Sequence, residues 1–162
     1  MIDSQDLVHL QRCIELAREA LEAGDDPFGS ILVDGVTNSI LQEDRNRINT
    51  KGDPTWHPEL TLAQWAGKHL TTGQRASAVV YTSGEHCPMC AAAHAWVGLG
   101  RIVYASSASQ LAQWMVEFGS QPGVVRPLAI NEIAPSLRVD GPAPGLDVKV
   151  KELHRLRTSR SV

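Results

Sequence analysis

The sequence predicts an α/β protein in three layers, with a mixed five-stranded sheet between two layers of helices. Segments of helical periodicity alternate with short β-branched runs, and such alternation is typical of parallel strands joined by helices. The first two strands are instead neighbours in the sequence and are joined by a short turn, which predicts an opening β-hairpin. A hairpin added to parallel strands makes the sheet mixed.

Five segments carry apolar side chains every three or four residues, so that these side chains gather on one helical face. Asp3 or Ser4 can cap the first helix, and Gly24 can end it. Thr55 can cap the second helix, with Pro58 in its first turn, where a missing N–H costs little. The predicted helices span residues 7–21, 55–70, 88–99, 109–118 and 146–157.

Five short apolar runs have the length and residue types of strands. Asp34 and Gly35 form a dipeptide that tolerates the positive φ of a hairpin turn between the first two runs. Residues 135–146 hold three prolines and two glycines and are predicted to form a linker or a surface arm. The predicted strands span residues 31–33, 39–41, 76–82, 101–105 and 126–133.

Length and composition predict one domain over residues 1–162, with a core at about 5–133 and a C-terminal arm and helix at 134–162. A formal net charge of −3 gives no basic field for a phosphate backbone, so nucleic acid is not expected as the main substrate. Neither a signal peptide nor a membrane span is apparent, so we expect a cytoplasmic protein with reduced cysteines. Cys13 is expected to be a buried small hydrophobe.

Two short clusters offer metal ligands of matched chemistry. His57 begins the second helix, and Cys87 and Cys90 lie three residues apart at the start of the third. One imidazole and two thiolates are three ligands, which leaves one position of tetrahedral zinc for water. Glu59 is then a candidate proton carrier, because a carboxylate beside such a water can take its proton and return it to a leaving group. The sequence predicts a hydrolytic zinc site.

Two other interpretations of this cluster remain. A closed structural zinc site could use His94, but seven residues along a helix place His94 about 10 Å from Cys87, too far to share one ion. A zinc-stabilised binding protein without catalysis is the second alternative. Glu59 separates it from an enzyme, because a structural site has no use for a carboxylate beside its metal.

These clusters resemble the zinc-dependent cytidine and deoxycytidylate deaminase superfamily, whose signature is H-x-E followed by P-C-x-x-C. The residues 53–59, DPTWHPE, are similar to the D-P-T-x-H-x-E of the free-base deaminases of guanine and cytosine type. The residues 82–90, TSGEHCPMC, are similar to their T-S-x-E-x-C-P-M-C, and residues 27–29 match their P-F-G. The resemblance covers residues 5–118 and implies a cytidine-deaminase-like fold.

The resemblance also implies an activity, a substrate pocket and a homodimer. Members remove the exocyclic amine of a heterocycle as ammonia, and we expect a cytosine-like, triazine-like or guanine base as the substrate. The tRNA adenosine deaminases share the zinc motif and are the alternative. The pocket is expected to include Asn46, which falls where the family keeps an asparagine on the substrate ring, and Phe28 as a wall. Further pocket candidates lie beside the zinc ligands or on the third helix: Trp56, His86 and Trp96.

The chain departs from the family pattern at three places. His86 replaces the proline that usually precedes the first zinc cysteine, and Trp56 stands where small residues are common. Guanine deaminases also carry a late acidic residue that reads the base edge, and this chain shows no clear equivalent of it. Glu117 and Glu132 lie in the corresponding part of this chain.

Overall fold

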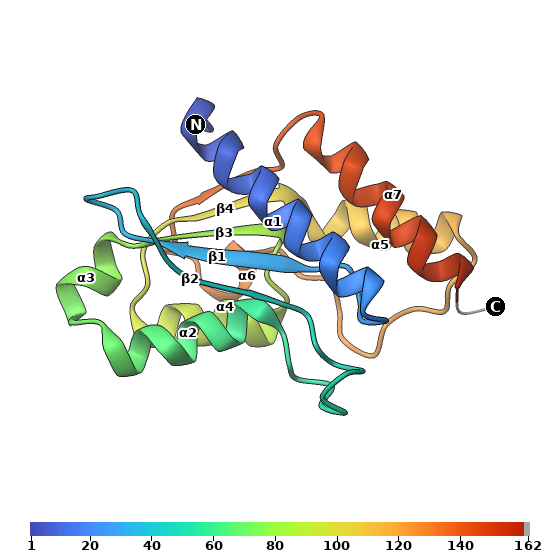
Figure 1. The fold of residues 1–162 in the computed structure, drawn as a ribbon, viewed down its shortest axis with the longest axis horizontal. Coiled ribbons are helices and arrows are strands. Elements are labelled where there is room, and N and C mark those ends of the chain that lie inside the picture. Colours follow the sequence, from blue (N-terminus) through green and yellow to red (C-terminus); the bar gives the residue numbers. More distant parts are fainter. Residues whose placement is uncertain (161–162) are drawn as a thin grey trace.

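The computed structural model describes residues 1–160, which contain a five-stranded sheet between two helical layers (Figure 1). The strand order is β2-β1-β3-β4-β5; β1 runs antiparallel to β2 and β3, whereas β3, β4 and β5 are parallel. The predicted mixed sheet with its opening hairpin is therefore confirmed. The strands are β1 (Gly29–Val33), β2 (Ile40–Arg45), β3 (Val79–Gly84), β4 (Ile102–Ser106) and β5 (Val139–Asp140).

Helices cover both faces of this sheet. Figure 1 shows α1, α5 and α7 on one face and α2 and α4 on the other. Each layer buries its own set of side chains: Ile31 of β1 packs in the core under α1, and its neighbour Leu32 packs in the core under α2. The helices are α1 (Ser4–Glu22), α2 (Pro58–His69), α3 (Thr72–Ser77), α4 (Pro88–Val97), α5 (Ala108–Glu117), α6 (Ile130–Ile133) and α7 (Leu146–Ser159). None of these helices is both long and apolar enough to cross a bilayer.

The chain directions bring several element ends to one edge of the sheet. Because β1 is antiparallel to β3, its first residues lie beside the last residues of β3, and Ser30 pairs with Thr82. The end of β2 lies at this same edge, since Gly29 pairs with Arg45. Ligands of α/β proteins gather beyond the carboxyl ends of parallel strands, which is the edge where β3 ends. The fold therefore places the β2–α2 and β3–α4 connections where a site is expected.

The predicted fifth strand is wrong in position. Residues 126–133 contain the short helix α6, and the fifth strand is Val139–Asp140, inside the stretch predicted as a linker or arm. Two residues are too short for a strand pattern to be recognised in a sequence. Ion pairs hold this strand in place, because Asp140 accepts from Arg101 at 2.7 Å and from the N-terminal amine at 2.6 Å.

The helix starts agree with the prediction in α1, differ from it in α2, and include one helix, α3, that was not predicted. Asp3 caps α1 as expected, accepting hydrogen bonds from the backbone of the first turn. Thr55 does not cap α2, because its hydroxyl donates to Asp53 and the cap position belongs to His57. The prediction missed α3, whose capping box joins Thr71 to Gln74. The C-terminal arm contains β5 and α7, and its residues 161–162 lie outside the described part.

Candidate metal centre

Two helix starts carry the predicted zinc ligands. His57 is the cap residue of α2 and Cys87 that of α4, and each is followed by a proline at the first helical position. Proline suits that position because its fixed φ is helical, and because a backbone N–H there would have no acceptor within the helix. Neither cap residue satisfies the helix through its side chain. Both side chains are thereby available to bind an ion.

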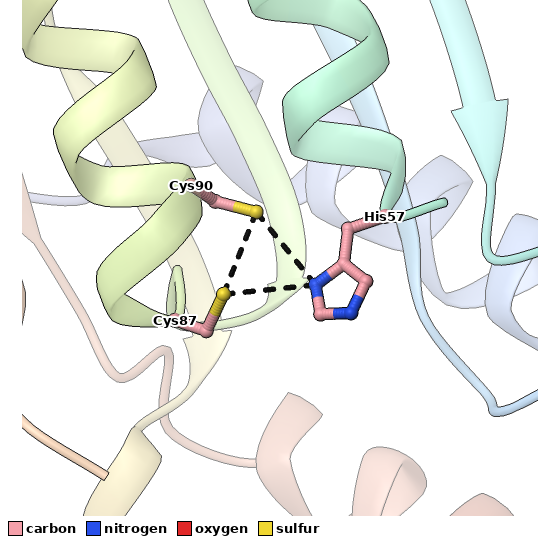
Figure 2. Close-up of side chains that lie close together, drawn as sticks. All are labelled: His57, Cys87 and Cys90. Atoms are coloured by element: carbon pink, nitrogen blue, oxygen red, sulfur yellow. Dashed lines mark hydrogen bonds between the residues drawn. The ribbon is translucent and has the colours of Figure 1, made fainter. Parts of the chain in front are cut away.

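Figure 2 shows the ring of His57 facing the two sulfur atoms across the gap between α2 and α4. The Nδ1 atom of His57 lies 3.6 Å from Sγ of Cys87 and 3.7 Å from Sγ of Cys90, and the two sulfurs are 3.6 Å apart. Tetrahedral zinc with ordinary bond lengths separates its nitrogen and sulfur ligands by about 3.6 to 3.8 Å. These three residues therefore fit zinc without rearrangement.

Glu59 lies beside the three donors, in the first turn of α2. Its side chain is buried, and Oε2 lies 3.9 Å from Sγ of Cys90. The hydroxyl of Thr82, at the end of β3, lies 3.2 Å from Oε1 and can donate to it. Burial raises the pKa of Glu59 to about 7, although the neighbouring His57 acts in the opposite direction. A buried carboxyl group with a pKa in this range can both accept and donate a proton near neutral pH.

The thiols and the imidazole influence one another strongly. Hydrogen bonds with Cys90 and His57 lower the pKa of Cys87 to about 4, whereas the hydrogen bond with Cys87 and burial raise the pKa of Cys90. The same contact with Cys87 raises the pKa of His57. The protons of the two thiols and the imidazole are therefore coupled to one another. Binding of a divalent ion displaces such protons, which makes metal affinity dependent on pH.

The structure places three of the predicted pocket residues around this edge. Asn46 directly follows β2, its side chain is buried, and its backbone N–H donates to the carbonyl of Phe28 at 2.9 Å. Phe28 lies over the end of β3, so close that a Cβ on Gly84 would stand 3.0 Å from its ring. The indole Nε1 of Trp56 is buried and has no hydrogen-bond partner among the described residues. The roles of these three side chains toward a substrate stay predictions.

The other two pocket candidates lie elsewhere on α4 or next to it. His86 is 1% exposed, its ring packs edge-on against His94, and neither ring nitrogen has a hydrogen-bond partner in residues 1–160. Burial lowers its pKa well below the usual value. Trp96 is 87% exposed on the outer surface of α4. These contacts lend no support to a substrate role for either residue.

The alternative zinc ligand His94 is not part of the donor cluster. Among the described residues, the group of donors within 4.8 Å of one another consists of His57, Cys87 and Cys90. His94 instead bonds through Nε2 to the carbonyl of Gly100 at 2.9 Å. Three protein donors on one ion are the arrangement of catalytic zinc sites, which keep a position for water or substrate.

Sequence reasoning assigned no role to Glu85, although it belongs to the quoted T-S-x-E-x-C-P-M-C segment. Its two carboxylate oxygens accept from the backbone N–H groups of Ala108 at 2.8 Å and Ile130 at 2.9 Å. Glu85 thereby ties the β3–α4 connection to the starts of α5 and α6. The two late acidic candidates each have a partner within the protein. Glu117 pairs with Lys151 of α7, and Glu132 accepts from the backbone N–H of Ala129.

Comparison with known proteins finds a family model and several relatives that match the part of the chain containing the zinc ligands. The model of the cytidine and deoxycytidylate deaminase zinc-binding region matches residues 3–106. A guanine deaminase of Bacillus subtilis is 38% identical over 106 residues, which are 64% of this chain and 66% of that enzyme. A "Probable cytosine deaminase" of Schizosaccharomyces pombe is 32% identical over 130 residues, 80% of this chain and 75% of that protein. A tRNA-specific adenosine deaminase of Bacillus subtilis is 30% identical over 101 residues, 62% of each chain.

Solved structures support the fold. The guanine deaminase of Nitrosomonas europaea superposes with a TM-score of 0.74 at 19% identity, covering 98% of this chain and 86% of that one. The guanine deaminase of Bacillus subtilis gives a TM-score of 0.58 at 27% identity, covering 83% and 91%. The family model covers well over half of the chain, and its zinc-binding residues are present in bonding geometry. The chain belongs to the cytidine and deoxycytidylate deaminase zinc-binding family.

Proposed function

We propose that this protein is a hydrolytic deaminase that removes the exocyclic amine of a small free amino-heterocycle and releases ammonia. The observation that carries the proposal is the buried carboxylate of Glu59, whose Oε2 lies 3.9 Å from a zinc-ligand sulfur. A carboxylate so placed adds nothing to a structural metal site, whereas hydrolysis requires a proton carrier there. The free-base activity is favoured by the relatives named as guanine and cytosine deaminases.

His57, Cys87 and Cys90 would hold zinc, which would supply a Lewis acid that makes water a better nucleophile. Glu59 is placed to accept a proton from the water whose oxygen would bond to the amine-bearing ring carbon, and to pass that proton to the adjacent ring nitrogen. Glu59 then moves the second proton of the water to the amine. The carbon–nitrogen bond breaks, ammonia leaves, and the ring keeps a carbonyl. Thr82 holds the carboxylate in place through its hydroxyl.

Asn46 is proposed to orient the ring. Its Oδ1 accepts from the backbone N–H of Ile48 at 3.1 Å, whereas no described residue accepts a hydrogen bond from its Nδ2. An amide donor of this kind, at the edge where the zinc ligands meet, suits a ring nitrogen or carbonyl oxygen. Phe28 and Trp56 are proposed to wall the same pocket with apolar surface.

The test is release of ammonia from a panel that contains cytosine, guanine, an aminotriazine, their ribosides and an adenosine-containing tRNA stem-loop. We expect one or more free bases to react, and reaction of ribosides alone would contradict the free-base proposal. Reaction of the RNA alone would favour the tRNA alternative, against which the net charge of −3 argues. The variant Glu59→Gln should keep about one equivalent of zinc and lose at least about a hundredfold in turnover.

A homodimer and a cytoplasmic location are proposed as well. The exposed Trp96 on α4 is a candidate dimer contact, because large exposed aromatics are enriched at protein interfaces. Light scattering on the purified protein measures the oligomer directly. The three cysteines form no disulfide, and two of them are assigned to zinc, which suits a reducing compartment. Fractionation of cells that produce the protein checks it.

A further inference from the structure

Outside the metal centre, the loop between α1 and β1 contains one fully buried carboxylate, that of Asp25. Its Oδ1 accepts from the backbone N–H groups of Asn49 at 2.8 Å and Thr50 at 2.9 Å. Its Oδ2 accepts from the hydroxyl of Thr50 at 2.8 Å and from Nη1 of Arg45 at 3.0 Å. Burial opposes the charge, but the hydrogen bonds from Thr50, Asn49 and Arg45 prevail and lower the pKa of Asp25. Asp25 is therefore a charged group that accepts four hydrogen bonds.

The residues that donate these bonds lie on both sides of Asn46 in the sequence. Arg45 precedes it, and the same guanidinium nitrogen that contacts Asp25 also donates to the carbonyl of Asn46 at 3.1 Å. Asn49 and Thr50 follow it at the next turn of the connection. Asp25 thus clamps the chain before and after Asn46 from a single point. A side chain held between two such anchors loses little further freedom when a ligand binds it.

The clamp also joins the two segments that are proposed to face the substrate. Asp25 lies three residues before Phe28 in the same loop, and the carbonyl of Phe28 accepts from the backbone N–H of Asn46 at 2.9 Å. The carbonyl of Gly24 accepts from Nδ2 of Asn49 at 2.8 Å, which adds a further hydrogen bond between the same two loops. These hydrogen bonds hold the two segments against each other.

We propose that Asp25 is a positioning residue, which acts through Asn46 to hold its Nδ2 donor in place for the heterocycle. This inference rests on the proposed deaminase function and deepens it. Asp25 neither contacts the three zinc ligands His57, Cys87 and Cys90 nor belongs to the residues that move protons. Its loss should therefore weaken the recognition of the ring and leave the metal and the chemical step in place.

The experiment compares Asp25→Asn with Asp34→Asn. Asp34 also accepts two backbone N–H groups, from Val36 and Thr37, but it lies in the turn at the opposite end of β1. With the most reactive base of the ammonia panel, Asp25→Asn should raise KM about tenfold and change kcat by less than about threefold, because one well-made hydrogen bond to a charged group corresponds to about this factor. Zinc content should stay at about one equivalent, and Asp34→Asn should leave both constants unchanged.

A double-mutant cycle with Asn46→Ala separates positioning from general stability. If Asp25 acts through Asn46, adding Asp25→Asn to Asn46→Ala should raise KM by less than about twofold. Amide hydrogen exchange should become faster at residues 49 and 50 in Asp25→Asn, because their acceptor is lost. Where Asp25→Asn does not fold, Thr50→Val removes one of the four bonds and should raise KM about threefold, with Thr71→Val at the start of α3 as its control.

Each outcome has a definite meaning. An unchanged KM in Asp25→Asn and in Thr50→Val, with an active wild type, rejects the role of Asp25 and leaves the deaminase proposal intact. An equal rise in KM with and without Asn46 also rejects it, because the effect would then not pass through Asn46. A wild type that holds zinc and releases ammonia from no compound of the panel rejects the deaminase proposal and this inference together.

Discussion

The carboxylate of Glu59 and the hydroxyl of Thr82 lie 3.2 Å apart, and they connect the start of α2 to the end of β3. Ser30 on β1 donates to the same hydroxyl at 2.8 Å, so the proton of Thr82 is left to point toward Glu59 or the carbonyl of Gly84. When that proton points toward Glu59, the hydroxyls of Ser30 and Thr82 orient the carboxylate from two strands. A proton carrier depends on such orientation, because proton transfer requires hydrogen-bond reach.

We therefore expect Thr82→Val to lower kcat about tenfold and to leave zinc content unchanged. The valine is similar in volume but offers no hydrogen bond to Glu59 or to Ser30. Thr82→Ser keeps the hydroxyl and is the matched control, which should retain most of the activity. Steady-state ammonia release and metal analysis of both variants make the comparison. Equal losses in the two variants would show that packing, and not the hydroxyl, is important at this position.

Removal of one metal ligand should remove the metal. Cys90→Ser should bind less than about a tenth of an equivalent of zinc and unfold at a lower temperature, since part of the folding free energy comes from the ion. Cys13→Ser makes the same sulfur-to-oxygen change in a fully buried thiol of α1 that is not one of the three metal donors, and it should keep its zinc. Metal analysis and thermal unfolding give both quantities. Full zinc content in Cys90→Ser would contradict the assigned ligand set.

Glu85→Gln should loosen the connection that carries Cys87. The variant keeps one acceptor but loses charge-assisted bonds to the N–H groups of Ala108 and Ile130, so we expect about 2 kcal/mol of lost stability and zinc bound about tenfold more weakly. Glu152→Gln, which removes half of an exposed ion pair with Arg155, should leave stability and zinc affinity unchanged. Denaturant unfolding and competition with a chelator measure the two effects.

Asp6 should make stability dependent on pH in the acid range. Burial raises its pKa, but hydrogen bonds from Arg101 and Tyr81 outweigh this and leave the pKa below the ordinary value. A carboxyl group with a lowered folded pKa stabilises above its unfolded pKa, near about 4, and this contribution is lost as the pH falls through the folded pKa. Asp6→Asn should therefore cost about 3 kcal/mol at about pH 7 and flatten the decline below about pH 4. Parallel curves for the two proteins would contradict this account.

The donor set could be predicted because its chemistry restricts both residue type and spacing. Two thiols one helical turn apart and an imidazole at another helix start are rarely combined except around a metal ion, and the structure brings them within 3.7 Å. The sequence did not predict which ring nitrogen of His57 faces the sulfurs. That choice depends on the side-chain torsions of His57, which residue type and spacing do not specify.

The elements that were misplaced are those held by contacts distant in the sequence. Asp140 is part of a strand because Arg101 and the N-terminal amine bind it, and these partners are 39 and 139 residues away. Asp25 was overlooked because its hydrogen-bond donors come from a connection 20 or more residues along the chain. Local periodicity carries no information about such pairs, whereas it does describe the long helix α1, whose buried face follows a regular spacing.

His57 and Cys87 are 30 residues apart in the chain, so a zinc ion bound between them would link α2 to α4 as well as take part in catalysis. This cross-link would be present only while zinc is bound. The unfolded chain has no preformed site that could bind the ion again. Scarcity of zinc would consequently reduce the amount of intact protein as well as its turnover.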